Sequence, residues 1–278
     1  MPQCLLAQEW AIRFSAFASV IVVMALWELW APRRRLSVGR TRRWPSNLGV
    51  VALDSLIVRM LFPTAAVGFA LACEARGWGL FNALALPFSL AAAISVILLD
   101  FAIYLQHVLF HAVPALWRLH RMHHADLDFD VTTGVRFHPM EILLSLLIKF
   151  GVIALFGASA LSVLIFEVLL SATSIFNHSN AAMPAAVDRI VRLLVVTPDM
   201  HRVHHSILRA ETNSNFGFNF PWWDRLFGTY RAQPKEGHDA MTIGIESFRD
   251  PAELRLDRML LQPLREVQDR YPIRQRQE

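Results

Sequence analysis

Long apolar stretches constrain the fold of this chain more than any other feature of its sequence. Residues 11–31, AIRFSAFASVIVVMALWELWA, are long enough to cross the hydrocarbon core of a bilayer as one helix. Two more apolar stretches, at roughly 48–72 and 83–105, have similar lengths. Hydrophobic residues make up 54% of the chain, which is more than an ordinary soluble domain contains. We therefore expect an all-α, polytopic membrane protein.

A secretory signal peptide is the competing interpretation of the first apolar stretch. Its length disfavours that interpretation, as do the single arginine upstream and the bulky Trp27 and Trp30 where a cleavage site needs small residues. Tryptophan at the end of an apolar stretch is typical of the membrane–water interface. We expect a retained membrane helix.

A further apolar stretch runs from Glu141 to Phe176 and is broken near FGASA (156–160). It is too long for one span, so a helical hairpin that enters the membrane and returns is the better interpretation. The predicted fold therefore has about three spanning helices and a membrane hairpin, under a histidine-rich helical cap.

The segment PRRRLSVGRTRRWP (32–45) is rich in arginine and lies between two predicted spans. A solvated charge run or a nucleic-acid site is disfavoured, the latter because no aromatic-rich binding module follows. Cytoplasmic loops of membrane proteins collect Lys and Arg, so this segment predicts the topology. The N-terminus is then outside, and 106–140 and 177–278 face the cytoplasm. The basic residues are almost all arginines, and with no obvious organelle retrieval signal this favours a bacterial inner membrane.

We expect residues 1–278 to form a single membrane domain. It would consist of N-terminal spans (1–105), a first histidine-rich cytosolic segment (106–140), the membrane hairpin (141–176) and a second histidine-rich segment with the C-terminal tail (177–278). All the histidines fall in the two predicted cytosolic segments.

The histidines follow a repeated pattern: HRMHH at 120–124 and HRVHH at 201–205. Residues three and four apart share one helical face, so each motif presents three imidazoles together, and a further pair is four apart. Such imidazoles would repel if protonated and need partners if buried and neutral. A metal ion is that partner. These eight side chains exceed the ligand number of one ion, which predicts a two-metal site formed by His107, His111, His120, His123, His124, His201, His204 and His205.

Three other histidines lie outside these motifs. His178, in FNHSN, is an additional candidate ligand. His138, in RFHPMEI, precedes a proline, so it is either a ligand, a helix cap or a group that orients a neighbour. His238 is expected on the surface. Cys4 and Cys73 are too few and too far apart for a thiolate site.

Polar side chains near the histidines could orient the imidazoles. Asp100 and Tyr104 precede His107 on the same helical stripe, and a carboxyl group near a span is costly without a partner. The alternative for Asp100 is a solvated carboxylate at the end of the helix. Glu141 is a further candidate, and Glu167 has no partner that the sequence identifies. The weaker candidates are Asp199, Asn177, Asn180, Asn213, Asn215 and Asp224.

Imidazole suits iron, zinc and copper alike, so the ligand type does not identify the metal. Two ions in all-nitrogen surroundings at a membrane surface favour chemistry on a lipid. Oxygen activation fits, because an unactivated C–H bond needs a metal oxidant and a site shielded from water.

Seven motifs between residues 95 and 230 occur in a specific order: DFAIYLQHVLFH, LWRLHRMHHADLD, RFHPME, NHSN, TPDMHRVHH, SNFGF and WWDRLFGTY. This order resembles the sterol desaturase and fatty acid hydroxylase superfamily of membrane di-iron oxygenases. The resemblance implies that the eight histidines are iron ligands and that His178 is the additional family histidine. The role of His138 carries over less surely. Val108 departs from the arginine that many members have after the first histidine.

The resemblance further implies O2-dependent hydroxylation or desaturation of a lipid by two iron ions, with zinc as an ion that the purified protein could carry. Electrons would come from a ferredoxin, rubredoxin or small cytochrome with an NAD(P)H-linked reductase. Arg118, Arg121 and Arg202 would contact an acidic donor or, equally, lipid phosphates. Sterols, fatty acyl chains, sphingolipids, ether lipids and carotenoids all remain open as substrates.

Two other functions compete with this one. A membrane metal transporter would place its ligands near the bilayer midplane on interrupted helices, whereas these histidines cluster near predicted helix ends. A zinc-dependent membrane hydrolase would use zinc-bound water and would need fewer histidines with a carboxylate base.

Overall fold

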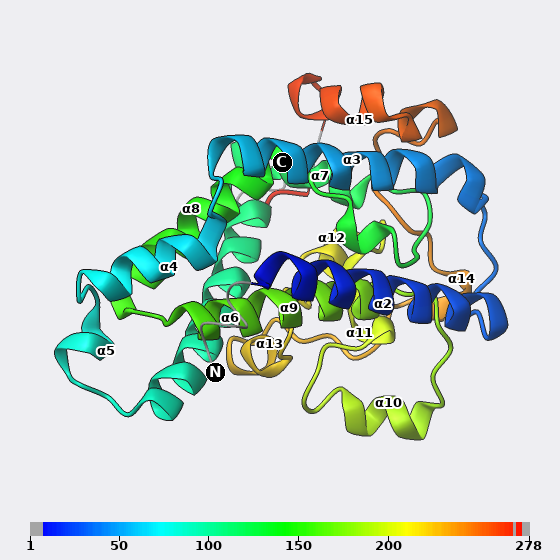
Figure 1. The fold of residues 1–278 in the computed structure, drawn as a ribbon. Coiled ribbons are helices and arrows are strands. Elements are labelled where there is room, and N and C mark those ends of the chain that lie inside the picture. The colour runs from blue at the N-terminus through cyan, green and yellow to red at the C-terminus, as the bar shows by residue number, and fades with distance from the viewer. Residues whose placement is uncertain (1–7, 269–270, 274–278) are drawn as a thin grey trace.

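The computed structural model describes residues 8–268 and 271–273, and within them the protein consists of helices, turns and two isolated β-bridges (Figure 1). Among these described residues, five segments are long and apolar enough to cross a membrane. The prediction of an all-α, polytopic membrane protein is confirmed. These segments are α2 (Glu9–Trp30), the run Arg40–Ala83, α6 (Phe88–Ala112), α8 (Pro139–Phe156) and α9 (Ala160–Asn177).

The second apolar segment is not the single helix that the sequence suggested. It is divided into α3 (Arg40–Leu61), α4 (Ala65–Ala75) and α5 (Leu80–Ala83). Pro63 lies in the break between α3 and α4, and proline cannot continue a helix because it lacks the N–H group and clashes with the preceding turn. The second half of the arginine-rich segment is also helical, since α3 already begins at Arg40.

The hairpin is confirmed at the predicted position. α8 ends at Phe156, and Gly157 follows with a φ of 75°, a left-handed conformation that glycine adopts without strain. Ser159 then caps α9 by accepting a hydrogen bond from the Ser162 N–H. Both helices of the hairpin pack against α4 and α6. Their shared core contains Ala66, Ala70, Leu99, Ile103, Leu146, Ile153, Val163 and Phe166.

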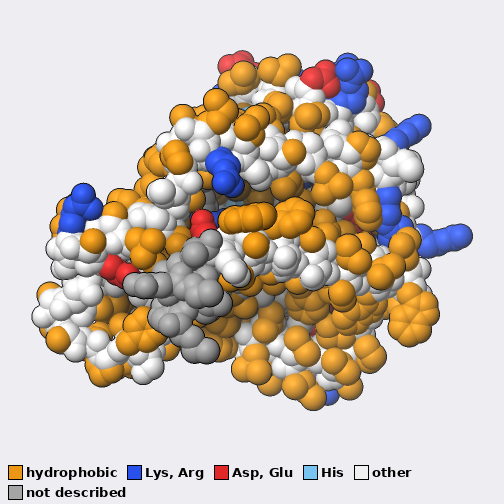
Figure 2. All heavy atoms as spheres, viewed as in Figure 1, with side chains coloured by type: hydrophobic (Ala, Val, Ile, Leu, Met, Phe, Trp, Pro, Cys, Tyr) orange, Lys and Arg blue, Asp and Glu red, His pale blue; other side chains and the backbone are white. Residues whose placement is uncertain are grey.

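α2 packs along α9 and leaves most of its apolar surface uncovered. Phe14, Val23 and Leu29 are each more than half exposed. Figure 2 shows this face of the molecule, where apolar side chains predominate over charged ones. An exposed apolar surface of this extent is expected for helices that contact lipid.

The remaining helices are short and form the cap that holds the histidines. The Trp30–Arg40 connection lies against this cap, because Pro32 pairs with Ala181 and Arg33 forms an ion pair with Asp239. The arginine-rich segment and the histidines are therefore on one side, as predicted; which side faces the cytoplasm stays a prediction. The cap comprises α7 (Pro114–His124), η1 (Thr133–Val135), α10 (Ala185–Val191), α11 (Pro198–His204), α12 (Arg209–Thr212), α13 (Trp222–Leu226), α14 (Gly237–Ala240), η2 (Pro251–Leu254), α15 (Leu256–Leu261) and η3 (Gln262–Leu264).

A buried ionic network joins α3 to the loop after α7. The Arg43 guanidinium lies 2.7 Å from an oxygen of Asp126 and 2.6 Å from one of Asp130, and all three side chains are fully buried. Asn47 adds a hydrogen bond to Asp126. Burial alone would raise the pKa of Asp126, but the adjacent Arg43 guanidinium holds that pKa well below its usual range. The loop is thus held to α3 by charge as well as by packing.

Candidate metal centre

Nine histidines converge in two buried groups at the ends of α6, α7, α9 and α11. In each group the potential ligand atoms lie within 4.8 Å of one another. The first histidine group is His107, His111, His120, His124 and His204; the second histidine group is His123, His178, His201 and His205.

Each H-R-x-H-H motif contributes to both groups. On α7, the i and i+4 residues His120 and His124 join the first group, while His123 joins the second. The α11 motif does the reverse: His201 and His205 join the second group, and His204 the first. α11 is held in place by Thr197, whose side chain caps it, and by Pro198 in its first turn. The motif on α7 therefore gives two histidines to the first group and one to the second, and the motif on α11 gives one to the first and two to the second.

The second histidine group has contacts that hydrogen bonding cannot explain. His178 Nε2 lies 3.2 Å from His123 Nε2, 3.0 Å from His201 Nε2 and 3.2 Å from His205 Nε2. His178 Nδ1 donates to the Ser174 carbonyl at 2.8 Å, so Nε2 has only a lone pair. One lone pair cannot accept three donors, but nitrogens bound to one ion at about 2.1 Å are separated by about 3.0–3.4 Å. The residues fit a metal ion.

The first histidine group is oriented by acceptors around it. His107 Nδ1 lies 2.8 Å from the Phe216 carbonyl, and His204 Nδ1 lies 2.7 Å from the Ser214 carbonyl. His111 Nδ1 lies 3.1 Å from Asn213 Oδ1, and His120 Nδ1 lies 2.7 Å from a Glu141 oxygen.

Because every one of these four neighbours is an acceptor, Nδ1 carries the proton and Nε2 keeps its lone pair. His111 Nε2, His204 Nε2 and both nitrogens of His124 are buried without a hydrogen-bond partner among the described residues. Such orphaned donors and acceptors are rare in native interiors, and a bound metal ion would satisfy one nitrogen of each of these rings.

Burial keeps the imidazoles neutral. It lowers the pKa of His120 and of His178 to about 3. Burial is the larger cause and repulsion from neighbouring imidazoles the second for five further rings, whose pKa values fall well below their usual range: His123, His124, His201, His204 and His205. Neutral imidazole is the form that binds metals, so both groups are in the state that coordination requires.

Two histidines lie outside the groups. His138 accepts a hydrogen bond from the Met140 N–H and caps α8, so of the roles left open for it the helix cap is the one observed. His238 was expected on the surface but is buried, with Nε2 3.6 Å from a carboxylate oxygen of Asp199. A histidine alone in a polar loop carries no periodic signal that distinguishes these positions.

The three predicted supporting residues differ in their contacts. Glu141 contacts His120 directly, as described above. Asp100 instead accepts hydrogen bonds from Trp223 Nε1 at 2.7 Å and from the Asn219 N–H at 3.3 Å. The Tyr104 hydroxyl lies 3.0 Å from Thr229 Oγ1. Neither Asp100 nor Tyr104 has a hydrogen bond to a histidine in the described structure; both hold the 213–230 loop against α6.

Asp224 organises that same loop, although the sequence made it only a weaker candidate. Its two carboxylate oxygens accept hydrogen bonds from the Phe216 and Gly217 N–H groups, each at 2.8 Å. This fixes the Phe216 carbonyl that accepts from His107. Asn213 was likewise a weaker candidate. The carbonyls of Ser174, Ser214 and Phe216 could not be found from sequence, because every residue has one.

The predicted arginine surface is largely wrong. Arg121 is buried and donates to the carbonyls of Gln262 and Arg265. Arg202 is buried as well and pairs with Asp199. Only Arg118 is partly exposed, and its Nε donates to the Pro263 carbonyl. Two of these three side chains are therefore structural and cannot contact an external protein.

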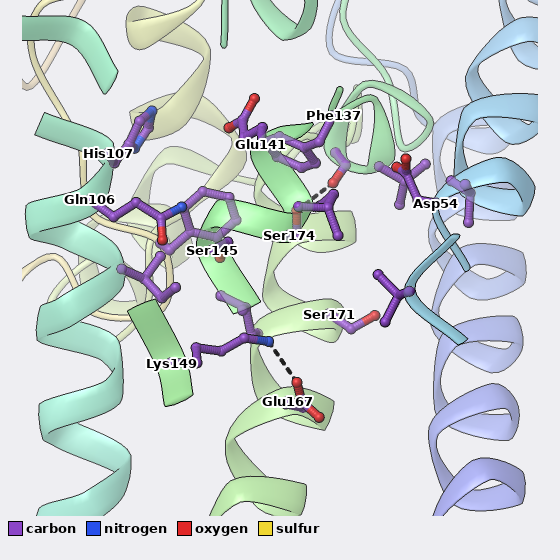
Figure 3. A pocket seen from close by; sticks show the side chains of 18 of the residues that line it. Asp54, Gln106, His107, Phe137, Glu141, Ser145, Lys149, Glu167, Ser171 and Ser174 are labelled. Atoms are coloured by element: carbon purple, nitrogen blue, oxygen red, sulfur yellow. Dashed lines mark hydrogen bonds and ion pairs between the residues drawn. The ribbon is translucent and has the colours of Figure 1, made fainter. Parts of the chain in front are cut away.

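A cavity of about 350 Å³ lies beside the first histidine group, with His107 and His120 in its wall (Figure 3). Most of its lining is apolar, including Phe110, Phe137 and Phe218. Toward the other end, Lys149 Nζ lies 2.6 Å from one Glu167 oxygen and Arg13 Nη1 lies 2.9 Å from the other. Glu167, which had no partner in the sequence interpretation, therefore has two.

Comparison with known proteins gives one family match and several similar proteins. Residues 92–229 match the fatty acid hydroxylase family. An ornithine lipid hydroxylase, OlsE, from Rhizobium tropici is 30% identical over 149 residues, which are 54% of this chain and 44% of that protein. The alkylglycerol monooxygenase of Homo sapiens is 29% identical over 154 residues (54% and 32%). The cholesterol 25-hydroxylase of Rattus norvegicus is 29% identical over 161 residues (58% and 52%).

The chain spans between about a third and a half of the length of each of these relatives. No solved structure is significantly similar to it. The matched residues contain all nine clustered histidines. The chain belongs to the fatty acid hydroxylase (sterol desaturase) superfamily.

Proposed function

We propose that this protein hydroxylates a membrane lipid with O2, using two iron ions. The observation that carries the proposal is the pairing of two buried, neutral histidine groups with an apolar cavity inside a bundle of membrane helices. The names of the relatives describe hydroxylation of an ornithine lipid and of cholesterol, and monooxygenation of alkylglycerol. These names support a lipid as the substrate class.

The nine clustered histidines would hold the metal, with one ion in each group. Bound iron supplies the activation of O2 and the oxidation of a C–H bond. In sum, the lipid C–H, O2, two electrons and two protons give the alcohol and water. The electrons would come from a separate ferredoxin, rubredoxin or small cytochrome with its NAD(P)H-linked reductase.

The chain's own residues prepare the site for this reaction. Asn213, Glu141 and the loop carbonyls fix the tautomers, so that the Nε2 lone pairs point into the first group. Phe137 stacks on His123 with ring centroids 4.4 Å apart and also lines the cavity. Together with Phe218 it keeps water away from the reacting carbon.

The competing functions fit less well. Ligands for transport would lie on interrupted helices near the midplane, whereas these histidines are enclosed at helix ends. For a zinc hydrolase, Glu141 is the carboxylate nearest to a histidine, but one of its oxygens already accepts from His120.

We place the protein in a bacterial inner membrane, with the histidines on the cytoplasmic side.

The full chain, purified in mild detergent from iron-supplemented cells, tests the proposal. We expect about two irons per chain by elemental mass spectrometry. We also expect one ¹⁸O atom from ¹⁸O2 in a lipid product when a ferredoxin and its reductase are added. His123→Ala should lose iron and product, whereas His238→Ala, a buried histidine outside both groups, should keep them. One ion or none in folded protein, or an unsaturated product without ¹⁸O, would contradict the proposal.

A further inference from the structure

Large apolar side chains are exposed on the cap as well as on the predicted spans. They lie on α10, on the turn that follows it and on α13, and Ile190 and Leu226 are 67% and 69% exposed. We call this set the cap patch; its members are Val187, Ile190, Leu193, Leu194, Trp222, Leu226 and Phe227. Figure 2 shows apolar side chains gathered over α10, in the lower part of the view. A group of this kind marks a contact with a partner or a membrane.

Hydrogen bonds join the two segments of the cap patch. Trp222 Nε1 donates to the Leu193 carbonyl at 3.0 Å, and Arg225 Nη2 donates to the Arg192 carbonyl at 3.2 Å. α13 therefore lies beside the turn that follows α10, and the exposed side chains of both segments belong to one surface.

The cap patch continues the exposed apolar surface of α6. Ile97, Phe101, Leu105 and Leu109 are four residues apart and share one face of that helix. Ile97, Leu105 and Leu109 are exposed, whereas Phe101 is partly covered by Phe227, whose ring centroid is 5.8 Å away. Because α6 is long and apolar enough to cross the membrane, this face contacts lipid, and the cap patch adjoins it directly.

The contact between α13 and α6 also gives the depth of the cap patch. Trp223 Nε1 donates to Asp100 at 2.7 Å, and Asp100 is the central residue of α6 (Phe88–Ala112). The hydrocarbon core of a bilayer is about 30 Å thick and a helix rises about 1.5 Å per residue, so the centre of a spanning α6 is within hydrocarbon. α13 packs against that centre and is therefore not surrounded by water alone.

The exposed charges beside the cap patch favour lipid over other occupants. Arg189 and Arg225 are exposed, whereas Asp188 and Asp224 of the same two helices are buried. α10 and α13 thus present only positive charge, which anionic lipid phosphates attract. A second copy bound through the same surface by a two-fold axis would instead bring identical arginines together.

We propose that α10 and α13 are embedded in the leaflet on the side of the cap, with the cap patch among the acyl chains and Arg189 and Arg225 at the phosphates. Amphipathic segments lie in the membrane interface in this way without crossing the bilayer. One side of the cap is then in lipid, and the 213–230 loop that orients His107 is held at the membrane. The inference concerns a contact surface and does not depend on the reaction.

Fluorescence quenching in lipid nanodiscs with one full-length chain per disc tests the inference. A Cys4→Ser background leaves Cys73, which is buried, and one introduced cysteine carries the dye NBD. The discs contain phosphatidylcholine and phosphatidylglycerol, with a nitroxide either on the headgroup or near the top of an acyl chain. The more effective nitroxide reports the depth of the dye.

We expect dyes at Ile190→Cys and Leu226→Cys to be quenched by the acyl-chain nitroxide about threefold or more above the dye at Asp257→Cys, an exposed position on α15. The dye at Arg189→Cys should be quenched most by the headgroup nitroxide. Leu56→Cys, exposed on α3, gives the value for a membrane helix. If Leu226→Cys does not fold, Leu194→Cys replaces it.

Two results would overturn the inference. Quenching at Ile190 and Leu226 no greater than at Asp257 would show that the cap patch faces water. Dyes shielded both from the lipid nitroxides and from iodide in the buffer would show that protein covers it. Discs that hold two chains, compared with discs that hold one, would then identify a second copy as that protein.

Discussion

The position of one proton on each imidazole decides how the histidines are used. In the first histidine group, four rings donate from Nδ1 to a carbonyl, an amide or a carboxylate oxygen. Each acceptor lies outside the group and therefore directs the free lone pair inward. Removing one acceptor would allow the ring to turn or change tautomer. The effect should be local, because none of these four acceptors contacts a ring of the second group, where the Ser174 carbonyl accepts from His178 Nδ1.

Asn213→Leu tests this dependence at His111. The substitution keeps the size of the side chain but removes the oxygen that accepts from Nδ1. Loss of such a supporting contact lowers metal affinity by about 10–100-fold, so we expect one ion to leave at a lower chelator concentration while the other stays. Chelator titration followed by elemental analysis measures this. Asn82→Leu, at an exposed position, is the control, and loss of both ions together from the Asn213 variant would contradict the argument.

His238 gives a pH dependence that does not involve the metal groups. Burial lowers its pKa from 6.5 to about 4. Below pH 6.5 the unfolded chain therefore takes up a proton that the folded chain does not. The contribution of neutral His238 to the free energy of unfolding is complete above pH 6.5. It falls by about 1.4 kcal/mol per pH unit as the pH drops toward 4.

When the pH falls from about 7.5 to about 5, the free energy of unfolding of the wild type should drop by about 2 kcal/mol more than that of His238→Gln. Denaturant unfolding in detergent at the two pH values gives this difference. The same pH slope in both proteins would show that His238 is protonated in the folded state.

At the residue level the sequence predicts which histidines cluster better than it predicts the side chains that contact them. Nine histidines stand out because three- and four-residue spacings repeat and because His178 lies at the end of the hairpin. His138 does not join them, since a residue before proline is equally suited to cap a helix. Asp100 and Tyr104 share the helical stripe of His107, yet they contact the loop that follows α12. Which side of the stripe meets that loop depends on tertiary packing, which periodicity does not encode.

Among the elements, α3 has the most specific attachment to the cap. Arg43→Ala would remove the only side chain that forms ion pairs with both Asp126 and Asp130 in the described structure. Leaving two buried carboxylates without a cation costs about 3–5 kcal/mol. We expect a matching loss in the free energy of unfolding, measured with denaturant in detergent. Arg42→Ala changes the adjacent, exposed arginine and should have little effect; equal losses in the two variants would refute the role of the network.

The sequence predicts the apolar elements well where their breaks carry a local signal. The hairpin turn falls at Gly157 and Ser159, a left-handed helix end followed by a helix cap, and both residue types favour those positions. Pro63 carried an equally local signal, but the apolar composition on both sides concealed the break. The Arg43 network was invisible for a different reason. Its aspartates are more than 80 residues away in sequence, so only the folded chain brings the charges together.

Across the whole molecule, the N-terminal helices do more than anchor the protein. Glu28 at the end of α2 is fully buried, and one of its oxygens accepts from the Val131 N–H at 2.8 Å and from the Asn180 N–H at 2.5 Å. These two groups lie in the two histidine-bearing segments. Together, α2 and α3 therefore hold both segments in place.

A fragment comprising residues 84–278 should consequently fail to retain metal, although it contains every histidine. Coexpression of residues 1–83 should restore about two ions per complex, because the division falls in the connection between α5 and α6. Elemental analysis of the fragment alone, of the two pieces together and of the intact chain measures this. Two ions in the fragment alone would show that the N-terminal helices are dispensable.

The buried network of Arg43 limits how this fold can be recombined. The segment that matches the family begins at residue 92, so a chimaera that grafts it onto the membrane anchor of another protein receives Asp126 and Asp130 without their cation. Such a graft would carry two negative charges in its interior and no counterion. The anchor is therefore not an interchangeable part: a donor scaffold must offer an inward-facing arginine on the helix that takes the place of α3.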